Sequence, residues 1–203
     1  MKHTTELISP FRDDRPSEEC GVVAVSSPSG EETAQLAFFG LFALQHRGQE
    51  AAGIAVSDGQ RARIHKDVGL LAQIFTPETL APLTGYQAIG HTRYSTMGAS
   101  TARNAQPFLV ETMHGPLALA HNGSLVNATE LRSQLLQRGF ALTAASDTEV
   151  MALMLAAASG RTWEERLERT MPSWKGAYSL VLLGIDGFIA ARDPWGFRPL
   201  SIG

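Results

Sequence analysis

Short apolar runs separated by turn residues recur along the chain after residue 20. Runs of this length that are rich in Val, Ile, Leu and Tyr are typical of β-strands. They predict strands over residues 21–25, 52–57, 62–66, 86–94, 117–121, 178–183 and 187–191. Asp58-Gly59 is a strong signal for a two-residue hairpin turn, and Asp186-Gly187 predicts a second short turn.

The middle of the chain has a helical pattern instead. Helices are predicted over residues 33–45, 131–138 and 147–158, with another that begins near residue 162. Asn127-Ala-Thr-Glu130 resembles a capping box in front of the second of these helices, and Ser146 or Asp147 caps the third. Strands near both ends with helices between them favour an α+β fold with antiparallel sheets over alternating βαβ units.

Composition and charge restrict the class of protein. The chain has 203 residues, of which 44% are hydrophobic and 18% charged, and this fits one globular domain. The net charge of −3 gives no reason to expect a nucleic-acid or membrane partner, and no window approaches the roughly 20 apolar residues of a membrane span. The single cysteine, Cys20, cannot form an internal disulfide, so a reducing, cytoplasmic setting is expected.

The two ends of the sequence differ from the rest. Residues 1–19 are polar and without periodicity, and they lack the apolar segment of a signal peptide. We therefore expect a leader over residues 1–19 and an ordered domain over residues 20–203. Residues 199–203 begin a new element and stop, so we expect a domain from a longer protein.

Few residues are candidates for chemistry. Motifs for phosphate binding, zinc proteolysis and serine hydrolysis are absent, and the six histidines show no metal-ligand spacing, so no metal site is expected in this segment. Composition alone favours Cys20 as a small buried hydrophobe. Its position right after the leader favours catalysis. Cleavage between Glu19 and Cys20 would place a thiol and an α-amine of pKa roughly 7.7–8.0 on one residue, and the amine could act as base for the thiol.

Six motifs stand in the order found in class II glutamine amidotransferase domains. They are E-C-G-V (19–22), L-Q-H-R-G-Q-E-A-A-G-I (44–54), G-H-T-R-Y-S-T-M-G (90–98), A-H-N-G-S (120–124), S-D-T-E (146–149) and R-D-P-W-G-F-R-P-L (192–200). The form of the second motif is most similar to the N-terminal glutaminase domain of the amidophosphoribosyltransferase family. The resemblance spans residues 20–203 and implies a four-layer αββα sandwich of the N-terminal-nucleophile (Ntn) hydrolase type.

The resemblance assigns a role to each motif residue. Cys20 matches the nucleophile, and Asn122 and Gly123 match the oxyanion donors, through a side chain and a backbone N–H respectively. The alternative for Asn122-Gly123 is a hairpin turn. Arg93 matches the binder of the glutamine α-carboxylate, and its alternative is a solvated charge at a strand end. Asp147 matches the binder of the α-ammonium, and its alternative is a plain helix N-cap.

Supporting roles follow from the same resemblance. Arg47 is expected to support the catalytic terminus, and residues 94–100 are expected to form a loop that closes over glutamine. His91 and His121 are expected to be structural hydrogen bonders rather than catalysts.

The implied reaction is hydrolysis of L-glutamine to glutamate and ammonia through a Cys20 thioester, after self-cleavage of the Glu19–Cys20 bond. In full-length family members, a C-terminal phosphoribosyltransferase domain with Mg²⁺ combines the ammonia with phosphoribosyl pyrophosphate to make 5-phosphoribosylamine, the first step of purine biosynthesis. Some relatives with a propeptide also hold a 4Fe-4S cluster there. No cofactor is expected in this segment, and a homo-oligomer is expected at full length. The alternatives are another class II glutaminase domain, another Ntn amide hydrolase, or a non-catalytic domain of the same fold.

Overall fold

Two antiparallel sheets of four strands form the centre of the computed structural model, which describes residues 20–30, 32–94 and 101–203. The first sheet has the strand order β1-β4-β2-β3 and the second the order β5-β6-β7-β8. The strands are β1 (Gly21–Ser26), β2 (Ala51–Ser57), β3 (Ala62–Val68), β4 (Gln87–Arg93), β5 (Phe108–Thr112), β6 (Gly115–Leu125), β7 (Gly176–Leu183) and β8 (Phe188–Arg192).

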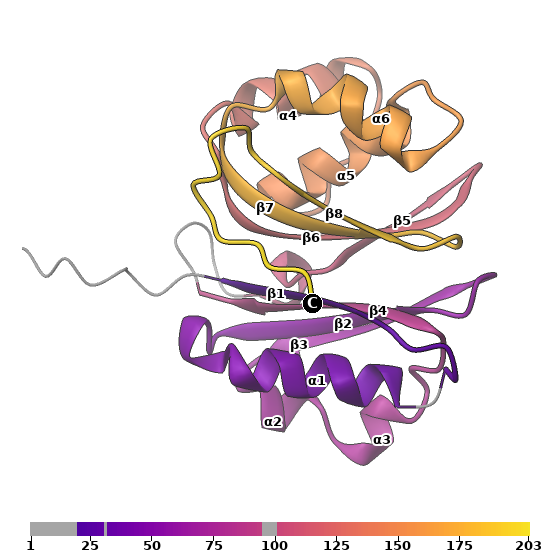
Figure 1. Ribbon diagram of the computed structural model, residues 1–203. Coiled ribbons are helices and arrows are strands. Elements are labelled where there is room, and N and C mark those ends of the chain that lie inside the picture. Colours follow the sequence, from indigo (N-terminus) through magenta and orange to yellow (C-terminus); the bar gives the residue numbers. More distant parts are fainter. Residues whose placement is uncertain (1–19, 31, 95–100) are drawn as a thin grey trace, which may run out of the picture.

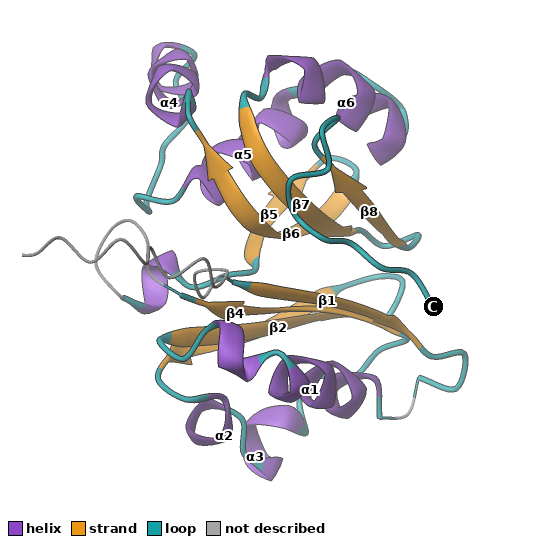
Figure 2. Cartoon of the chain, turned by 60° about the vertical axis from the view of Figure 1, so that its left-hand side comes forward, coloured by secondary structure: helices purple, strands orange, loops and turns teal. Residues whose placement is uncertain are grey.

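Helices cover the outer faces of both sheets. Figure 1 shows α1, α2 and α3 outside the first sheet and α4, α5 and α6 outside the second, and the turned view in Figure 2 keeps the sheets between these two groups. The α-helices are α1 (Thr33–Ala43), α2 (Leu71–Ile74), α3 (Pro77–Leu80), α4 (Ala128–Gln137), α5 (Asp147–Ala157) and α6 (Trp163–Thr170). Short 3-10 helices are η1 (Gln45–Arg47), η2 (Ala102–Asn104) and η3 (Met171–Ser173). The prediction of an α+β fold with two antiparallel sheets is confirmed. Within the described ranges, no helix has the length and apolar character needed to cross a membrane.

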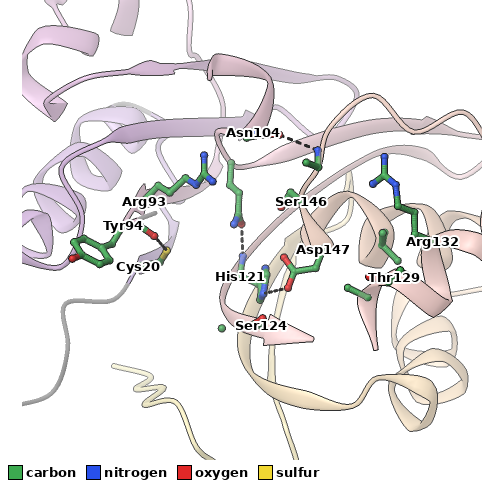
Figure 3. A pocket seen from close by; sticks show the side chains of 15 residues that line it. Cys20, Arg93, Tyr94, Asn104, His121, Ser124, Thr129, Arg132, Ser146 and Asp147 are labelled. Carbon is green, nitrogen blue, oxygen red and sulfur yellow. Dashed lines mark hydrogen bonds and ion pairs between the residues drawn. The ribbon is translucent and has the colours of Figure 1, made fainter. Parts of the chain in front are cut away.

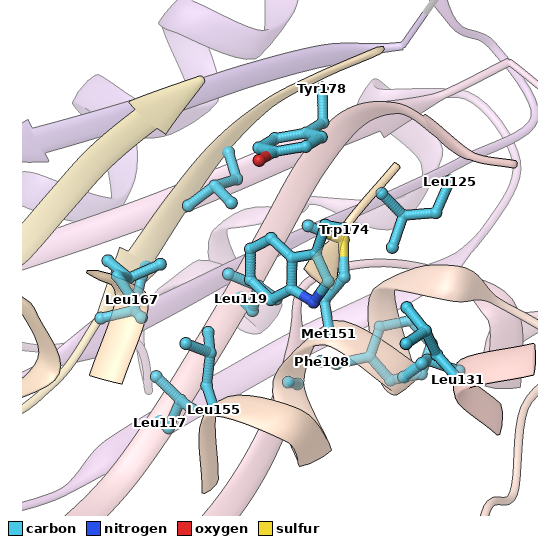
Figure 4. Packing of buried hydrophobic residues seen from close by; sticks show 14 of the residues in the cluster. Phe108, Leu117, Leu119, Leu125, Leu131, Met151, Leu155, Leu167, Trp174 and Tyr178 are labelled. Carbon is cyan, nitrogen blue, oxygen red and sulfur yellow. The ribbon is translucent and has the colours of Figure 1, made fainter. Parts of the chain in front are cut away.

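Strand alternation divides the core into layers. The outer face of the second sheet packs Leu117 and Leu119 of β6 under α5 in the largest apolar cluster, shown in Figure 4. The inner face carries Ala118 and Ala120, which meet Ile89 of β4 between the sheets. Because side chains on a strand alternate in direction, Asn122 follows Ala120 onto the inner face.

The same alternation places the cysteine. Val22 and Ala24 of β1 belong to the cluster between the sheets. Cys20 lies two residues before Val22, and side chains two residues apart on a strand point the same way. The Cys20 side chain therefore faces the gap between the two sheets. The β1–β4 pairing ends at Gly21 opposite Thr92, and one further step puts Cys20 opposite Arg93.

Two local predictions were wrong in detail. The hairpin between β2 and β3 has four connecting residues rather than two, because the Asp58 carboxylate accepts the N–H groups of Gln60 and Arg61 and widens the turn. Asn127 does not form a capping box. Its side chain instead donates to the Ser173 carbonyl and accepts the N–H of Lys175.

Candidate active site

A pocket lies where Cys20, just before β1, and the end of β4 meet β6 and the start of α5. Figure 3 shows Cys20, Arg93 and Tyr94 on one side of it and His121, Ser146 and Asp147 on the other. Four predicted site residues line this pocket together, namely Cys20, Arg93, Gly123 and Asp147. Segments far apart in the sequence therefore meet at one place.

Cys20 is held by contacts on both its side chain and its backbone. Its Sγ donates to the Tyr94 carbonyl at 3.5 Å, and its own carbonyl accepts from Arg47 Nε at 3.3 Å. The second contact fits the supporting role expected of Arg47. Burial raises the pKa of the Cys20 thiol above its ordinary value, while the Tyr94 hydrogen bond and the Arg93 charge act in the opposite direction. The thiol is only partly buried and faces the pocket, unlike an inert core residue.

Arg93 is the last residue of β4, and it is only 8% exposed. The alternative of a solvated charge at a strand end is therefore wrong. A buried guanidinium beside a nucleophile supplies a fixed positive charge and a planar pair of donors, which suits a carboxylate.

Asp147 opens α5 but does not cap it. Ser146 is the N-cap, because its Oγ accepts the N–H of Thr148 at 3.2 Å. Asp147 Oδ2 accepts the Leu125 N–H at 3.0 Å and lies 3.7 Å from His121 Nε2. Its other oxygen, Oδ1, has no hydrogen bond or ion pair within the described ranges, so it can accept a cation in the pocket.

Asn122 and Gly123 lie inside β6, so the alternative of a hairpin turn is wrong. Gly123 has a φ of 147°, and a Cβ there would meet the Ala177 carbonyl oxygen at 2.0 Å. Only glycine allows β6 to approach β7 this closely. Asn122 is 5% exposed and is not among the residues that line the pocket, although both of its chain neighbours are.

The edge of β6 is open beside the pocket. The β5–β6 pairing ends at Phe108 opposite Leu119, although β6 continues to Leu125. Beyond that point, side chains accept the N–H groups on this edge: Gln106 Oε1 accepts from His121 at 2.7 Å, and Asp147 Oδ2 accepts from Leu125. Gly123 lies midway between these two, and the alternation of a strand directs its N–H to the same edge. The geometry thus provides a backbone donor aimed at the pocket.

Other pocket residues were not predicted as part of the site. Gln106 and Asn104 both line the pocket, and Asn104 Oδ1 accepts the Ala145 N–H at 3.0 Å. Asn104 ends the short 3-10 helix η2 and Gln106 follows it, in a stretch whose sequence has no periodic signal. His121 bonds Thr148 Oγ1 through Nδ1 at 2.8 Å, which fits a structural hydrogen bonder.

Glu19 and residues 95–100, most of the expected closing loop, lie outside the described residues. In the part of the chain that is described, no group of three or more His, Cys, Asp or Glu side chains is placed to hold a metal ion.

The chain matches one protein family and several curated proteins. The model of the family described as "Glutamine amidotransferase domain" matches residues 91–203. The amidophosphoribosyltransferase of Synechococcus elongatus is 52% identical over 194 residues, which are 95% of this chain and 39% of that protein. The amidophosphoribosyltransferase of Methanocaldococcus jannaschii is 46% identical, over 91% of this chain and 40% of that protein. The chain therefore spans about two fifths of the length of these curated relatives.

Solved structures agree with the sequence matches. A structure described as the allosteric regulatory enzyme of purine biosynthesis superposes with a TM-score of 0.82 at 40% identity, over 88% of this chain and 38% of that one. The glutamine phosphoribosylpyrophosphate amidotransferase of B. subtilis, complexed with ADP and GMP, superposes with a TM-score of 0.78 at 38% identity. That match covers 89% of this chain and 38% of the other.

Proposed function

The chain belongs to the glutamine amidotransferase domain family, and from this premise we propose that it hydrolyses L-glutamine to glutamate and ammonia with Cys20 as the nucleophile. One observation carries the proposal: a thiol, a buried guanidinium, a carboxylate oxygen and a backbone N–H line the same pocket. Free glutamine has a carboxylate, an ammonium and an amide, and the pocket offers a counterpart for each. A general amide hydrolase would need no such pair of opposite charges.

Substrate binding follows from the charges. The Arg93 guanidinium would pair with the α-carboxylate, and Asp147 Oδ1 would accept the α-ammonium. The Asp147 carboxylate accepts a hydrogen bond from the Leu125 N–H through Oδ2, so its direction is fixed before substrate binds. Fixed groups lose little further freedom on binding, which favours a specific orientation of the amide toward Cys20.

The chemistry would proceed through a thioester. The Cys20 sulfur attacks the side-chain amide carbon, the thiol proton is transferred to the amide nitrogen, and the C–N bond breaks to release ammonia. Water then attacks the γ-glutamyl thioester and releases glutamate. Each step passes through a tetrahedral oxyanion, for which the Gly123 N–H and the Asn122 carboxamide are the proposed donors. Asn122 faces the gap between the sheets from the side opposite Cys20, which supports this assignment.

We propose that the active form begins at Cys20, after cleavage of the Glu19–Cys20 bond. Burial raises the pKa of the thiol, so a nearby base is needed near neutral pH. A free α-amine on Cys20 itself would meet that need. The Cys20 thiol directly precedes β1 and faces the gap between the two sheets, and helices cover the outer faces of both. This arrangement supports the four-layer Ntn hydrolase class for the fold.

We also propose a destination for the ammonia. The relatives at 52% and 46% identity are amidophosphoribosyltransferases, so the ammonia would combine with phosphoribosyl pyrophosphate to give 5-phosphoribosylamine in purine biosynthesis. That step would belong to a C-terminal phosphoribosyltransferase domain with Mg²⁺, and in some relatives with a 4Fe-4S cluster. A homo-oligomeric, cytoplasmic enzyme is part of the same proposal.

A glutaminase assay tests the first of these proposals. Purified wild-type protein should release glutamate from L-glutamine, and Cys20→Ala should abolish the release while the protein stays folded. Full activity in Cys20→Ala would overturn the proposal. D-Glutamine and N-acetyl-L-glutamine serve as matched substrates, because each misplaces or removes the ammonium that Asp147 is proposed to bind, and both should be poor substrates.

A further inference from the structure

Gln106 takes the place of a missing strand partner. If the β5–β6 pairing continued two residues beyond Phe108 and Leu119, the backbone of Gln106 would stand opposite His121. The strand ends instead, and the Gln106 side chain supplies the acceptor, with Oε1 2.7 Å from the His121 nitrogen. Gln106 is 6% exposed, so water has little access to replace this hydrogen bond.

Lys66 fixes the backbone on both sides of Gln106. Its Nζ donates to the Ala105 carbonyl at 2.6 Å and to the Pro107 carbonyl at 3.1 Å. Lys66 also lies 4.4 Å from the centre of the Phe108 ring, which adds a cation–π contact. One ammonium therefore holds the two residues that flank Gln106.

A glycine in the first sheet leaves room for the backbone of Gln106. Gly53 stands directly opposite Lys66 in the β2–β3 pairing. A Cβ at Gly53 would meet the Gln106 carbonyl oxygen at 2.2 Å, so the absence of a side chain lets this backbone lie against the first sheet. The Gln106 segment thus rests on one sheet while its side chain bonds the other.

We propose that Gln106 is a positioning residue for the oxyanion donors, held in place by Lys66. The open edge of β6 is fixed at His121 by Gln106 and at Leu125 by Asp147, and the Gly123 N–H lies between these two points. Asn122 directly follows His121, so the same hydrogen bond sets the direction of its side chain. This inference rests on the proposed glutaminase function and adds a cause for the placement of its donors.

Kinetics of Gln106→Leu separate positioning from simple stabilisation. Leucine is similar in size but cannot accept the His121 N–H. Misplaced donors weaken interactions made in the transition state, so kcat should fall about tenfold to a hundredfold. KM should change less than about threefold, because Arg93 and Asp147 still bind the charged ends of glutamine. Gln106→Glu keeps an acceptor and should retain a higher kcat than Gln106→Leu.

Two further variants keep the test decisive. Lys66→Met should also lower kcat, because it removes the hydrogen bonds that hold the backbone beside Gln106. This variant tests the proposal even if Gln106→Leu fails to fold. Gln134→Leu makes the same chemical change on an exposed side of α4, where the Gln134 side chain donates a hydrogen bond to Glu130, and should match wild type. A lower melting temperature with unchanged kcat in both Gln106→Leu and Lys66→Met would overturn the proposal.

Hydrogen exchange distinguishes failure of this proposal from failure of the proposed function. In the purified protein, the His121 amide should exchange at least about tenfold faster in Gln106→Leu than in wild type, with or without activity. If the His121 amide exchanges faster in Gln106→Leu while the wild type releases no glutamate, the glutaminase function is rejected and the positioning of β6 by Gln106 still holds. Unchanged exchange at His121 would reject the positioning role itself.

Discussion

Asp147 and Leu125 are joined by a hydrogen bond of 3.0 Å between the carboxylate Oδ2 and the backbone N–H. The first residue of α5 is thereby tied to the last residue of β6. One oxygen of Asp147 serves the fold, and the other remains available to the pocket. The structural role of this side chain and its proposed binding role can therefore be separated by mutation.

Asp147→Asn should separate those two roles. Asparagine can still accept the Leu125 N–H but has no charge for the substrate ammonium. We expect KM for glutamine to rise by at least about tenfold, with a free energy of unfolding within about 1 kcal/mol of wild type. Asp147→Ala should show the same KM effect and also lose about 1–3 kcal/mol of stability, because a buried N–H is left without its acceptor. Steady-state kinetics and urea unfolding measure both effects, and an unchanged KM in Asp147→Asn would contradict the binding role.

Arg93→Lys should weaken glutamine binding although it keeps the charge. Lysine cannot make the paired, planar contact with a carboxylate, so KM should rise about tenfold to a hundredfold. Arg63→Lys is the matched control, because Arg63 pairs with Asp58 at a half-exposed site outside the pocket. Its KM should stay within about twofold of wild type. Equal kinetics for the two variants would count against a carboxylate site at Arg93.

Gly123→Ala should strongly destabilise the protein. The added methyl group would meet the Ala177 carbonyl at 2.0 Å, and the φ of 147° is unfavourable for alanine. We expect a loss of about 3 kcal/mol or more in urea unfolding. Gly139→Ala is the control: its φ is 85°, but no atom lies within 4 Å, so about 1 kcal/mol is expected. Similar losses at both positions would show that close approach to β7 is not the cause.

The stability of the fold should depend on pH through His91. Burial, followed by repulsion from His121 and Arg93, lowers the pKa of His91 to about 3, against roughly 6.5 in an unfolded chain. Between these values the unfolded chain binds a proton that the folded chain does not. The stabilisation is therefore complete above pH 6.5 and is lost as the pH falls toward 3.

His91→Asn removes this titration. Between pH 6.5 and pH 4, wild type should lose roughly 3 kcal/mol more stability than the variant, as judged by urea unfolding at each pH. Parallel stability curves for the two proteins would contradict a buried, neutral His91.

Local patterns in the sequence predicted most strands but not how they end. The apolar run at residues 178–183 lies within β7. Its length and the turn residues on either side are local features, so the sequence alone could identify this strand. Strand β5 was not predicted, because its five residues include Glu111 and Thr112 and resemble a loop. The capping motif at Asn127 failed for a different reason: tertiary contacts with Ser173 and Lys175 compete for the same side chain.

The sequence predicted which residues form the candidate site but not the contacts that hold them in place. Family motifs singled out Cys20, Arg93 and Asp147, and the structure brings these three to one pocket. The part played by Gln106 had no signal, because it depends on where β5 leaves β6. Such a contact depends on the tertiary structure, and no local sequence pattern predicts it.

Intact-mass spectrometry and peptide mapping of the active protein, after reaction with an electrophilic glutamine analogue, identify both its first residue and its labelled residue. We expect a chain that begins at Cys20 and carries one adduct on that residue, with glutaminase activity lost in proportion to labelling. A fully active protein that retains residues 1–19, or one inactivated by labelling at another residue, would contradict it.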